Sequence, residues 1–345
     1  MSKVYLTTCA TLDTEIFYHW LNYYSDKVDD FFINLWGDSS IINFEEIISI
    51  MKEFGIETYL DCRDQHTFDE DYKTSLFNRT IARKPNNWWI PVDCDEFIHF
   101  DYGIKNEIKY NEENNYDYTF GLLLDRVSLD GKLVEVETTD DVFEKFPLVG
   151  NVAMVLKGYE TWVDKVSLCR GNDIRLLNGL HGIKKIEQEK ISNRITQHHH
   201  FKWTSNTLKN VKLQYEGLEK NGHGWFKEYE NLLSYLEKND GLDINNAEFL
   251  LSEWNGEYSY WDKFLEMDKQ IKSSKEFGKS VLTNSLHFVS INIIQFHFSF
   301  TFPELFISEH HCSNLLNFKT SFSSSLPFVS ITQCSPVLSF TIKSG

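Results

Sequence analysis

The sequence has few basic residues for its number of acidic ones. Lysine and arginine together number 34, against 51 aspartates and glutamates, which gives a formal net charge of -17. Proteins that bind the phosphate backbone of nucleic acids draw most of their affinity from basic side chains. The charge balance therefore excludes a general nucleic-acid binder, and we expect no nucleic acid among the partners.

Several short motifs are absent as well. The six cysteines include no CxxC pair, so neither a zinc knuckle nor a disulfide framework is expected. We expect reduced thiols, which favour a cytoplasmic protein that is at most peripheral to a membrane. Residues 1–15 lack the apolar run of a secretory signal. No GxxxxGK[ST] loop is present, which argues against a P-loop nucleotide hydrolase. The window 286–307 contains His, Asn, Gln and Pro, so no transmembrane span is expected there.

The first hundred residues predict alternating strands and helices. Apolar runs and helical spacing indicate strands at 4–8, 31–36, 56–60 and 88–92, with helices over 13–24, 44–54 and 69–83. The first helix is expected to begin with Asp13 as its N-cap. This order predicts an α/β fold with a mostly parallel, doubly wound sheet and helices on both faces. Ligands in such sheets bind beyond the carboxyl ends of the strands.

Composition separates the rest of the chain into two parts, residues 101–280 and residues 281–345. Short strand-like runs at 120–124 and 152–156 are followed by helices expected at 205–218 and 225–237. We therefore predict one domain over 1–280, with the alternating strands and helices in its first part, 1–100, and a second part at 101–280. The segment 281–345 is poor in charge and rich in Phe and Ser, and Phe296, Phe298, Phe300 and Phe302 alternate with polar residues as in a strand. It is either an appended β element or a tail without a role in the domain.

Two aspartates, Asp93 and Asp95, directly follow the apolar strand expected at 88–92. Paired carboxylates at a strand end suit a hard divalent cation such as Mn²⁺ or Mg²⁺, which prefers oxygen ligands. Such a cation neutralises a nucleotide diphosphate and assists its departure. Asp38 and Asp61 are expected at the ends of the preceding strands, so the acidic residues converge on one edge of the sheet.

The chain resembles glycosyltransferases of the GT-A fold, in particular the family 2-like and family 92-like enzymes. The resemblance lies in TTCATLDTEIFYHWLNYYS, FFINLW and WWIPVDCDEFIHF, and continues through LLLDRVSLDGKL and ITQHHHFKW. It covers about the first 240 residues and does not reach the tail. It implies that 1–100 form the nucleotide-binding half of the domain and 101–280 the acceptor half. It implies transfer of a sugar from a nucleotide-sugar donor, such as a UDP- or GDP-sugar, to a hydroxyl acceptor on a glycan, lipid or protein.

The resemblance also implies roles for individual acidic residues. Asp93 and Asp95 match the positions that hold the metal and the diphosphate. Asp38 or Asp61 would bond the base or ribose of the nucleotide, or would be an ordinary turn residue. Glu96 would be either an acid behind the metal ligands or a group that faces the acceptor.

Histidines and basic residues supply further candidates. GT-A enzymes often recruit a downstream histidine as a metal ligand, and His181 and the run 198–200 are available for this. In a strand, His198 and His200 share one face and His199 points to the other, so His198 and His200 are the expected ligands. Positive charge for the diphosphate is expected from one or more basic side chains, with surface solvation as the alternative: Lys165, Lys202, Arg126 and Arg170.

A catalytic base is harder to choose. Inverting family 2 enzymes place an acidic pair about a hundred residues after the metal motif. Here only Glu187 and Glu189 match that pair, and their surroundings are charged. Asp125 and Glu160 are the alternative bases. The sequence therefore leaves open whether the transfer inverts or retains the configuration of the sugar.

Trp162 and Trp225 would stack on a sugar ring or lie in the core. Two other functions remain: a metal-dependent nucleotidyl- or phosphotransferase, and a non-catalytic module that binds nucleotide sugars.

Overall fold

The computed structural model describes residues 2–12, 14–64, 68–158, 164–171, 174–185 and 187–256. Several predictions from the sequence lie outside these residues. They are the N-cap Asp13, the candidates Glu160 and Trp162, and the whole segment 281–345 with its alternating phenylalanines.

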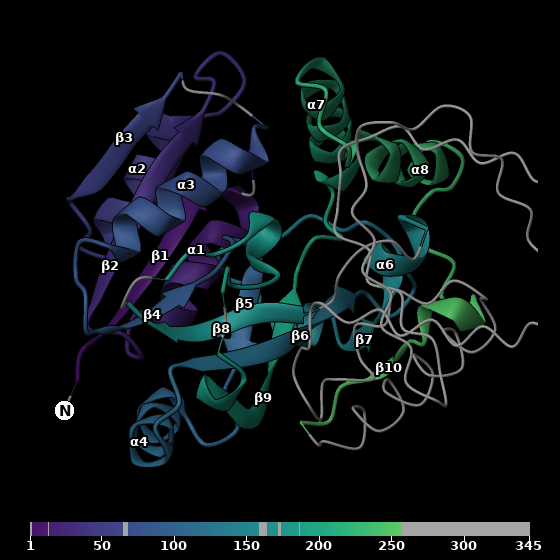
Figure 1. Cartoon of the computed structure of the whole chain (residues 1–345). Helices are drawn as coiled ribbons and strands as arrows, with labels where there is room; N and C mark the ends of the chain where they lie inside the picture. Colours follow the sequence, from purple (N-terminus) through teal and green to yellow (C-terminus); the bar gives the residue numbers. More distant parts are fainter. Residues whose placement is uncertain are drawn as a thin grey trace, which may run out of the picture. The chain divides into compact units, whose positions relative to one another are not determined.

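Four parallel strands carry the first part of the sheet (Figure 1). They lie in the order β4-β1-β2-β3, and β1 is buried along its whole length. Their bounds are β1 (Val4–Ala10), β2 (Asp30–Gly37), β3 (Tyr59–Arg63) and β4 (Trp88–Pro91). The predicted order of strands in this half is confirmed, but the third strand begins three residues later than expected. Asp61 therefore lies inside β3 and not at its end.

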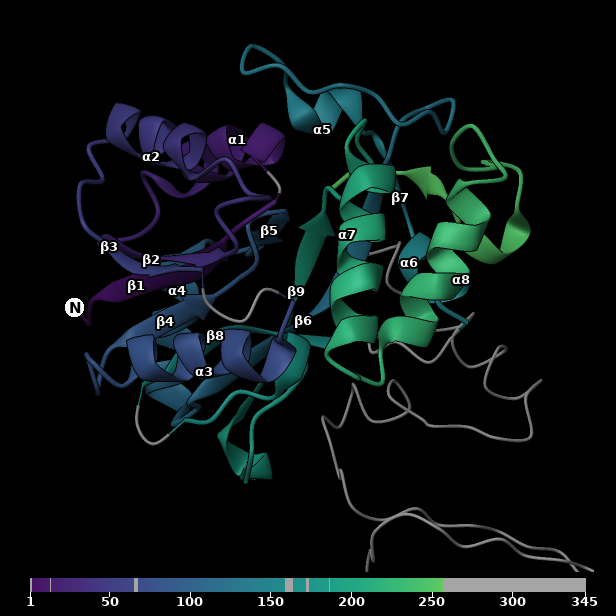
Figure 2. The same ribbon diagram turned by 90° about the horizontal axis from the view of Figure 1, so that it is seen from above.

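Helices cover both faces of these strands, as predicted (Figure 2). They are α1 (Thr14–Tyr24) and α2 (Phe44–Glu53) on one face, and α3 (Glu70–Ile81) on the other. Alternate side chains of β1 point to opposite faces. Leu6 accordingly packs in a core with Trp20 of α1, whereas Tyr5 packs in a second core with Phe77 of α3. Asp69 caps the N-terminus of α3 by accepting a hydrogen bond from the backbone N–H of Tyr72.

The second part of the sheet is mainly antiparallel, so the prediction of a mostly parallel sheet is wrong there. Among the described strands, five of the nine pairings are antiparallel. The pairings of β7 and β8 with their neighbours and of β5 with β9 are antiparallel, whereas β9 pairs with β6 in parallel. The strands are β5 (Glu96–His99), β6 (Tyr118–Val127), β7 (Leu148–Gly150), β8 (Asp164–Arg170), β9 (Ile191–His200) and β10 (Ser252–Glu253).

The remaining helices line the second part of the sheet. The α-helices are α4 (Ile104–Asn114), α5 (Val142–Lys145), α6 (Val152–Leu156), α7 (Thr207–Lys220) and α8 (Phe226–Leu236). Short 3-10 turns lie at Asn178–Leu180, Gln188–Lys190 and Ala247–Phe249. The run 152–156, expected as a strand, is the helix α6, because the buried Asp125 carboxylate accepts a hydrogen bond from the Ala153 N–H in its first turn.

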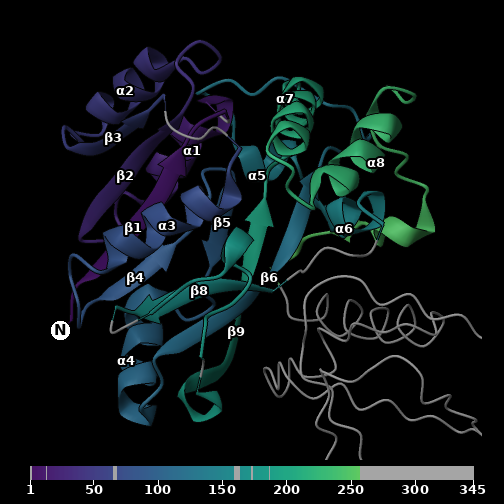
Figure 3. The same ribbon diagram turned by 45° about the horizontal axis from the view of Figure 1, so that its top comes forward.

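Two helices near the end of the described chain agree with the prediction. α7 and α8 pack side by side (Figure 3) and share a core with Trp203 and Val127. No helix within the described ranges is long and apolar enough to cross a membrane. The cysteines of the described part are free thiols, as expected: Cys9, Cys62, Cys94 and Cys169.

Candidate functional site

The turn between β4 and β5 carries the two aspartates of the Asp-x-Asp motif. Cys94 fixes the turn because its buried thiol lies 3.2 Å from the Thr8 hydroxyl and 3.6 Å from the Cys9 carbonyl oxygen of β1. Burying the central side chain leaves those of Asp93 and Asp95 available at the carboxyl edge of the parallel strands. The local sequence thus sets both carboxylates where ligands of such sheets bind.

Strand β9 brings its histidines to this turn. It runs antiparallel to β5, with Glu96 opposite His200 and Ile98 opposite His198. The Phe201 N–H donates a hydrogen bond of 2.8 Å to the Asp95 carbonyl oxygen. This bond extends the pairing of β5 and β9 by one residue. As the strand period predicts, His198 and His200 face the site. His199 points to the other face, where its ring packs 4.7 Å from that of Trp254.

His200 lies between two carboxylates. Its Nε2 is 3.1 Å from Asp95 Oδ2, and its Nδ1 is 2.9 Å from Asp125 Oδ1. Burial would lower the pKa of His200, but the two carboxylates raise it to about 10. Burial likewise opposes ionisation of Asp95, and His200 holds the pKa of that carboxyl below its usual value. The imidazole therefore carries a proton on each nitrogen when no cation competes for it.

Glu96 is buried and has one oxygen without a protein hydrogen bond. Lys165 Nζ lies 2.7 Å from Oε1. In the described part of the chain, Oε2 has no hydrogen-bond partner, and His198 Nδ1 lies 3.6 Å from it. Burial opposes ionisation, yet Lys165 and His198 hold the pKa of Glu96 well below its usual range. An ionised carboxylate with an unpaired buried oxygen is a group that a cation would satisfy.

Asp93 is held by lysines and not by histidine. Lys73 Nζ lies 3.0 Å from Asp93 Oδ1, and Lys165 Nζ lies 3.4 Å from Oδ2. Lys73 comes from the first turns of α3 and was not among the residues chosen from the sequence. A signal for it existed, because the helix that follows a parallel strand begins at the carboxyl edge of the sheet, and its first turns face the ligand site.

Asp95, Glu96 and His200 form a candidate cation site. Each offers one ligand atom, and these three atoms lie within 4.8 Å of one another. Two carboxylates and one imidazole suit Mn²⁺ and related divalent ions. The donor chemistry and the unpaired Glu96 oxygen both fit such an ion. Asp93 stands beside this group and is engaged with the two lysines.

A small cavity of about 120 Å³ opens next to these residues, and we call it the Asp95 cavity. Four lysines line it: Lys73, Lys157, Lys165 and Lys202. Tyr229 lies beneath two of them, 4.6 Å from Lys157 Nζ and 5.1 Å from Lys202 Nζ to the ring centre. Burial would raise the pKa of Tyr229, but these two ammonium groups lower it. The cavity therefore brings four lysines together with the carboxylates of the turn.

Two further residues chosen from the sequence reach this cavity. His181 lies in its wall with Nδ1 2.7 Å from the Asp164 carbonyl oxygen. Burial and the nearby Lys165 lower the pKa of His181 to about 3, so the ring is neutral. Trp225 also lines the cavity and is half-buried.

Several other candidates lie elsewhere. Asp61 pairs with Arg63 through two bonds of 2.9 and 2.6 Å on the exposed face of β3. Asp38 is half-buried, accepts a hydrogen bond from the Ser40 N–H within its own turn, and lines a separate cavity of about 480 Å³ with Asp64. Asp61 therefore does not reach the Asp95 cavity, and Asp38 faces a neighbouring space.

The remaining basic and acidic candidates have other surroundings. Arg126 is buried among the rings of Phe143, Phe201 and Trp254, and burial lowers its pKa to about 9. Arg170 lies 3.8 Å from Asp117 and stacks over Trp88. Glu187 and Glu189 are exposed around the 3-10 turn that precedes β9. None of these four residues lines the Asp95 cavity.

Comparison with known proteins gives only distant likenesses. No protein-family model matches the chain, and no curated protein matches it. A structure of S. aureus TarS 1–349 is 14% identical over 82% of this chain and 86% of that one, with a TM-score of 0.30. Another TarS structure is 11% identical over 79% of this chain and 48% of that one, at 0.29. A structure described as a Bacillus anthracis glucose-1-phosphate thymidylyltransferase with sucrose is 11% identical over 38% of this chain and 57% of that one, at 0.26. TM-scores this low do not establish a shared fold, and they assign no activity.

Proposed function

We propose that the chain is a metal-dependent glycosyltransferase that moves a sugar from a UDP- or GDP-sugar to a hydroxyl acceptor. One observation carries the proposal. Asp95, Glu96 and His200 converge at the carboxyl edge of the parallel strands, directly beside a cavity lined by four lysines. The resemblance of WWIPVDCDEFIHF to the corresponding segment of GT-A enzymes points to the same chemistry.

The protein groups suit a resident Mn²⁺ or Mg²⁺. Asp95, Glu96 and His200 would hold the ion, and when bound it would neutralise negative charge on a departing diphosphate. Asp125 is buried with one oxygen on His200 Nδ1 and the other on the Ala153 N–H. Such a carboxylate orients the imidazole and leaves Nε2 for the ion. We therefore assign Asp125 to positioning His200 and not to the role of base.

The charges around the cavity balance a diphosphate together with one divalent ion. Four lysines and four carboxylates line it, so the lining alone is close to neutral when His200 gives up its extra proton. The carboxylates are Glu70, Asp93, Asp95 and Glu96. A divalent ion adds two positive charges, which a diphosphate of similar negative charge offsets. Lys73 and Lys165 are the groups placed to contact it, because both line the cavity beside the Asp93 carboxylate.

Titration calorimetry tests this assignment. UDP, GDP, CMP and deoxynucleoside triphosphates are titrated into the protein in Mn²⁺ and again in EDTA. We expect one nucleoside diphosphate to bind only with the metal, and Asp95→Asn to weaken its binding at least about ten-fold. Glu113→Gln is the matched control, because Glu113 is an exposed carboxylate on α4 that pairs with Lys109 on the same helix, far from the residues that line the Asp95 cavity.

Two results would redirect the assignment. Preferential binding of a nucleoside triphosphate, with release of pyrophosphate on addition of a sugar phosphate, would identify a nucleotidyltransferase. Nucleotide binding that is equal in Mn²⁺ and EDTA, and equal in wild type and Asp95→Asn, would contradict the proposed metal site.

A further inference from the structure

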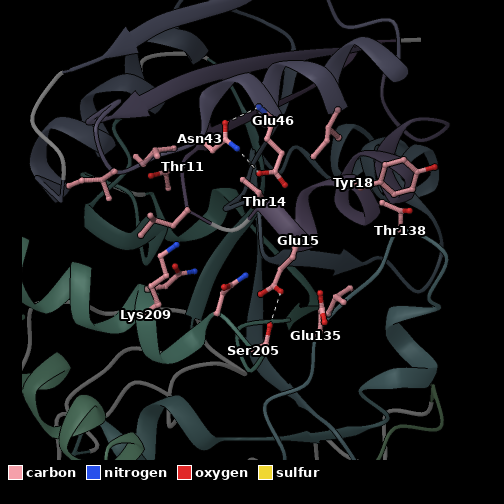
Figure 4. Close-up of a pocket in the computed structure, with 17 residues that line it drawn as sticks. Thr11, Thr14, Glu15, Tyr18, Asn43, Glu46, Glu135, Thr138, Ser205 and Lys209 are labelled. Atoms are coloured by element: carbon pink, nitrogen blue, oxygen red, sulfur yellow. Dashed lines mark hydrogen bonds between the residues drawn. The ribbon is translucent and has the colours of Figure 1, made fainter.

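A second and larger cavity lies on the α1 and α2 side of the sheet, and we call it the Glu15 cavity (Figure 4). Its volume is about 520 Å³, within the range of small-molecule sites in proteins. Its walls come from the loops after β1 and β2, from residues 135–138, and from the N-terminal end of α7. Thr11 lines both this cavity and the Asp95 cavity, so the two spaces adjoin at the end of β1.

The charge of its lining excludes anionic ligands. Three glutamates, Glu15, Glu46 and Glu135, face Lys209 as the single basic residue among the residues that line it. The Asp95 cavity has four lysines against four carboxylates, and the candidate cation site would add positive charge to it. The two adjoining spaces thus differ in electrostatic character, and a phosphate or nucleotide favours the Asp95 cavity.

The uncharged lining is rich in groups that bond hydroxyls. Amides and hydroxyls occupy most of the remaining polar positions: Thr11, Thr14, Asn43, Thr138, Ser205 and Asn206. Amides both donate and accept, and carboxylates accept two hydrogen bonds from neighbouring hydroxyls. Such a mixture satisfies a ligand that carries many hydroxyl groups and no negative charge.

Several of these groups are held in place before any ligand binds. The Glu15 carboxylate accepts hydrogen bonds from the Thr204 and Ser205 hydroxyls, and the Glu46 carboxylate accepts one of 3.1 Å from the Asn43 amide. The Thr11 Oγ1 atom is buried, and within the described residues it has no hydrogen-bond partner. An unpaired buried hydroxyl is costly unless a ligand or water satisfies it.

Apolar surface is present on the same walls. The ring of Tyr18 and the side chain of Ile41, which is 39% exposed, both line the cavity. Sugar rings present C–H faces that pack on such side chains while their hydroxyls bond polar groups. We propose that the Glu15 cavity binds a neutral saccharide. Its place beside the Asp95 cavity makes that saccharide the hydroxyl acceptor, a role that rests on the proposed function.

The test measures binding apart from catalysis. The full chain, in EDTA and without nucleotide, is titrated with glucose, galactose, mannose, N-acetylglucosamine and their disaccharides, followed by saturation-transfer NMR and calorimetry. Glucuronic acid and glucosamine serve as the anionic and cationic probes. We expect at least one neutral sugar to bind, and Glu15→Gln and Glu135→Gln each to weaken it about ten-fold, the scale of one lost charge-assisted hydrogen bond.

The variants are chosen so that the outcome is decisive. Glu135 is exposed, so Glu135→Gln leaves the fold intact even if Glu15→Gln does not. Glu113→Gln on α4 should bind as wild type does. Binding of no neutral sugar, tighter binding of glucuronic acid or glucosamine, or equal affinity in Glu135→Gln would overturn the proposal. Saccharide binding that persists when no nucleotide binds would uphold this site and reject the glycosyltransferase.

Discussion

The buried pair of Lys165 and Glu96 lends itself to a quantitative test. Their charged atoms are 2.7 Å apart, and the two side chains are 5% and 3% exposed. The substitution Lys165→Met keeps the length of the side chain but removes the closest cationic partner of the buried Glu96 carboxylate. Breaking a buried ion pair from one side costs about 3–5 kcal/mol, because the remaining charge has no compensating partner. We expect a loss of that size in the free energy of unfolding at pH 7.

The pH dependence of this loss has a definite sign. Lys165 and His198 hold the pKa of Glu96 below its unfolded value of about 4.3. Their contribution to stability is therefore present above that pH and is lost as the pH falls below it. The difference between wild type and Lys165→Met should begin to shrink above that pH, because the buried Glu96 of the variant takes up a proton there, and it should shrink further below that pH as the wild type loses its own contribution.

Urea unfolding in EDTA measures both effects. The double variant Lys165→Met/Glu96→Gln also removes the unpaired negative charge of Glu96 and should recover much of the lost free energy of unfolding. Equal stability of wild type and Lys165→Met at pH 7, or a double variant no more stable than Lys165→Met alone, would refute the arrangement of charges described for the site.

Three further outcomes are expected. The folded-state pKa of His181 is about 3. Below about pH 6.5, His181 therefore binds a proton in the unfolded chain but stays neutral in the folded chain. The stability loss between pH 7 and pH 5, measured by urea unfolding, should therefore be smaller in His181→Gln by about 2 kcal/mol. Asp125→Asn should weaken Mn²⁺ binding by about 10- to 100-fold through misorientation of His200, and an electron paramagnetic resonance titration that shows no change would reject this role. A chain that ends at Lys279 should keep wild-type nucleotide binding by calorimetry if the segment 281–345 lies outside the domain, and lost binding would assign the tail to the domain.

The first hundred residues could be predicted because local pattern decides their structure. Strand β1 alternates its side chains between two cores, and α1 and α2 have regular apolar spacing, so periodicity alone indicates their type. The boundary of β3 was less accurate, and a shift of three residues moved Asp61 from the expected strand end to an exposed position paired with Arg63.

The second part of the fold depends on contacts that local pattern does not contain. A short apolar run such as 152–156 is compatible with either a strand or a buried helix. Its helical state follows from Asp125, 28 residues earlier, which caps it. Pairing direction likewise depends on where the chain returns, and β9 inserts between β5 and β6 from about a hundred residues downstream.

The candidate site shows the same division. Asp95 and His200 were chosen from the sequence, and the structure brings them within 3.1 Å. The face shared by His198 and His200 follows from the strand period. Lys73 was missed because its contact with Asp93 depends on how α3 crosses the sheet, which no local pattern records.

The central claim is tested most directly by product release from nucleotide sugars. The protein is incubated with Mn²⁺ and, in turn, UDP-glucose, UDP-N-acetylglucosamine, UDP-galactose and GDP-mannose, with and without the neutral saccharides, and the released nucleoside diphosphate is measured. The account predicts that one donor is consumed, that EDTA abolishes its consumption, and that Asp95→Asn slows it at least about ten-fold while Glu113→Gln does not. Consumption of no donor, or a rate that is the same in EDTA and in Asp95→Asn, would contradict it.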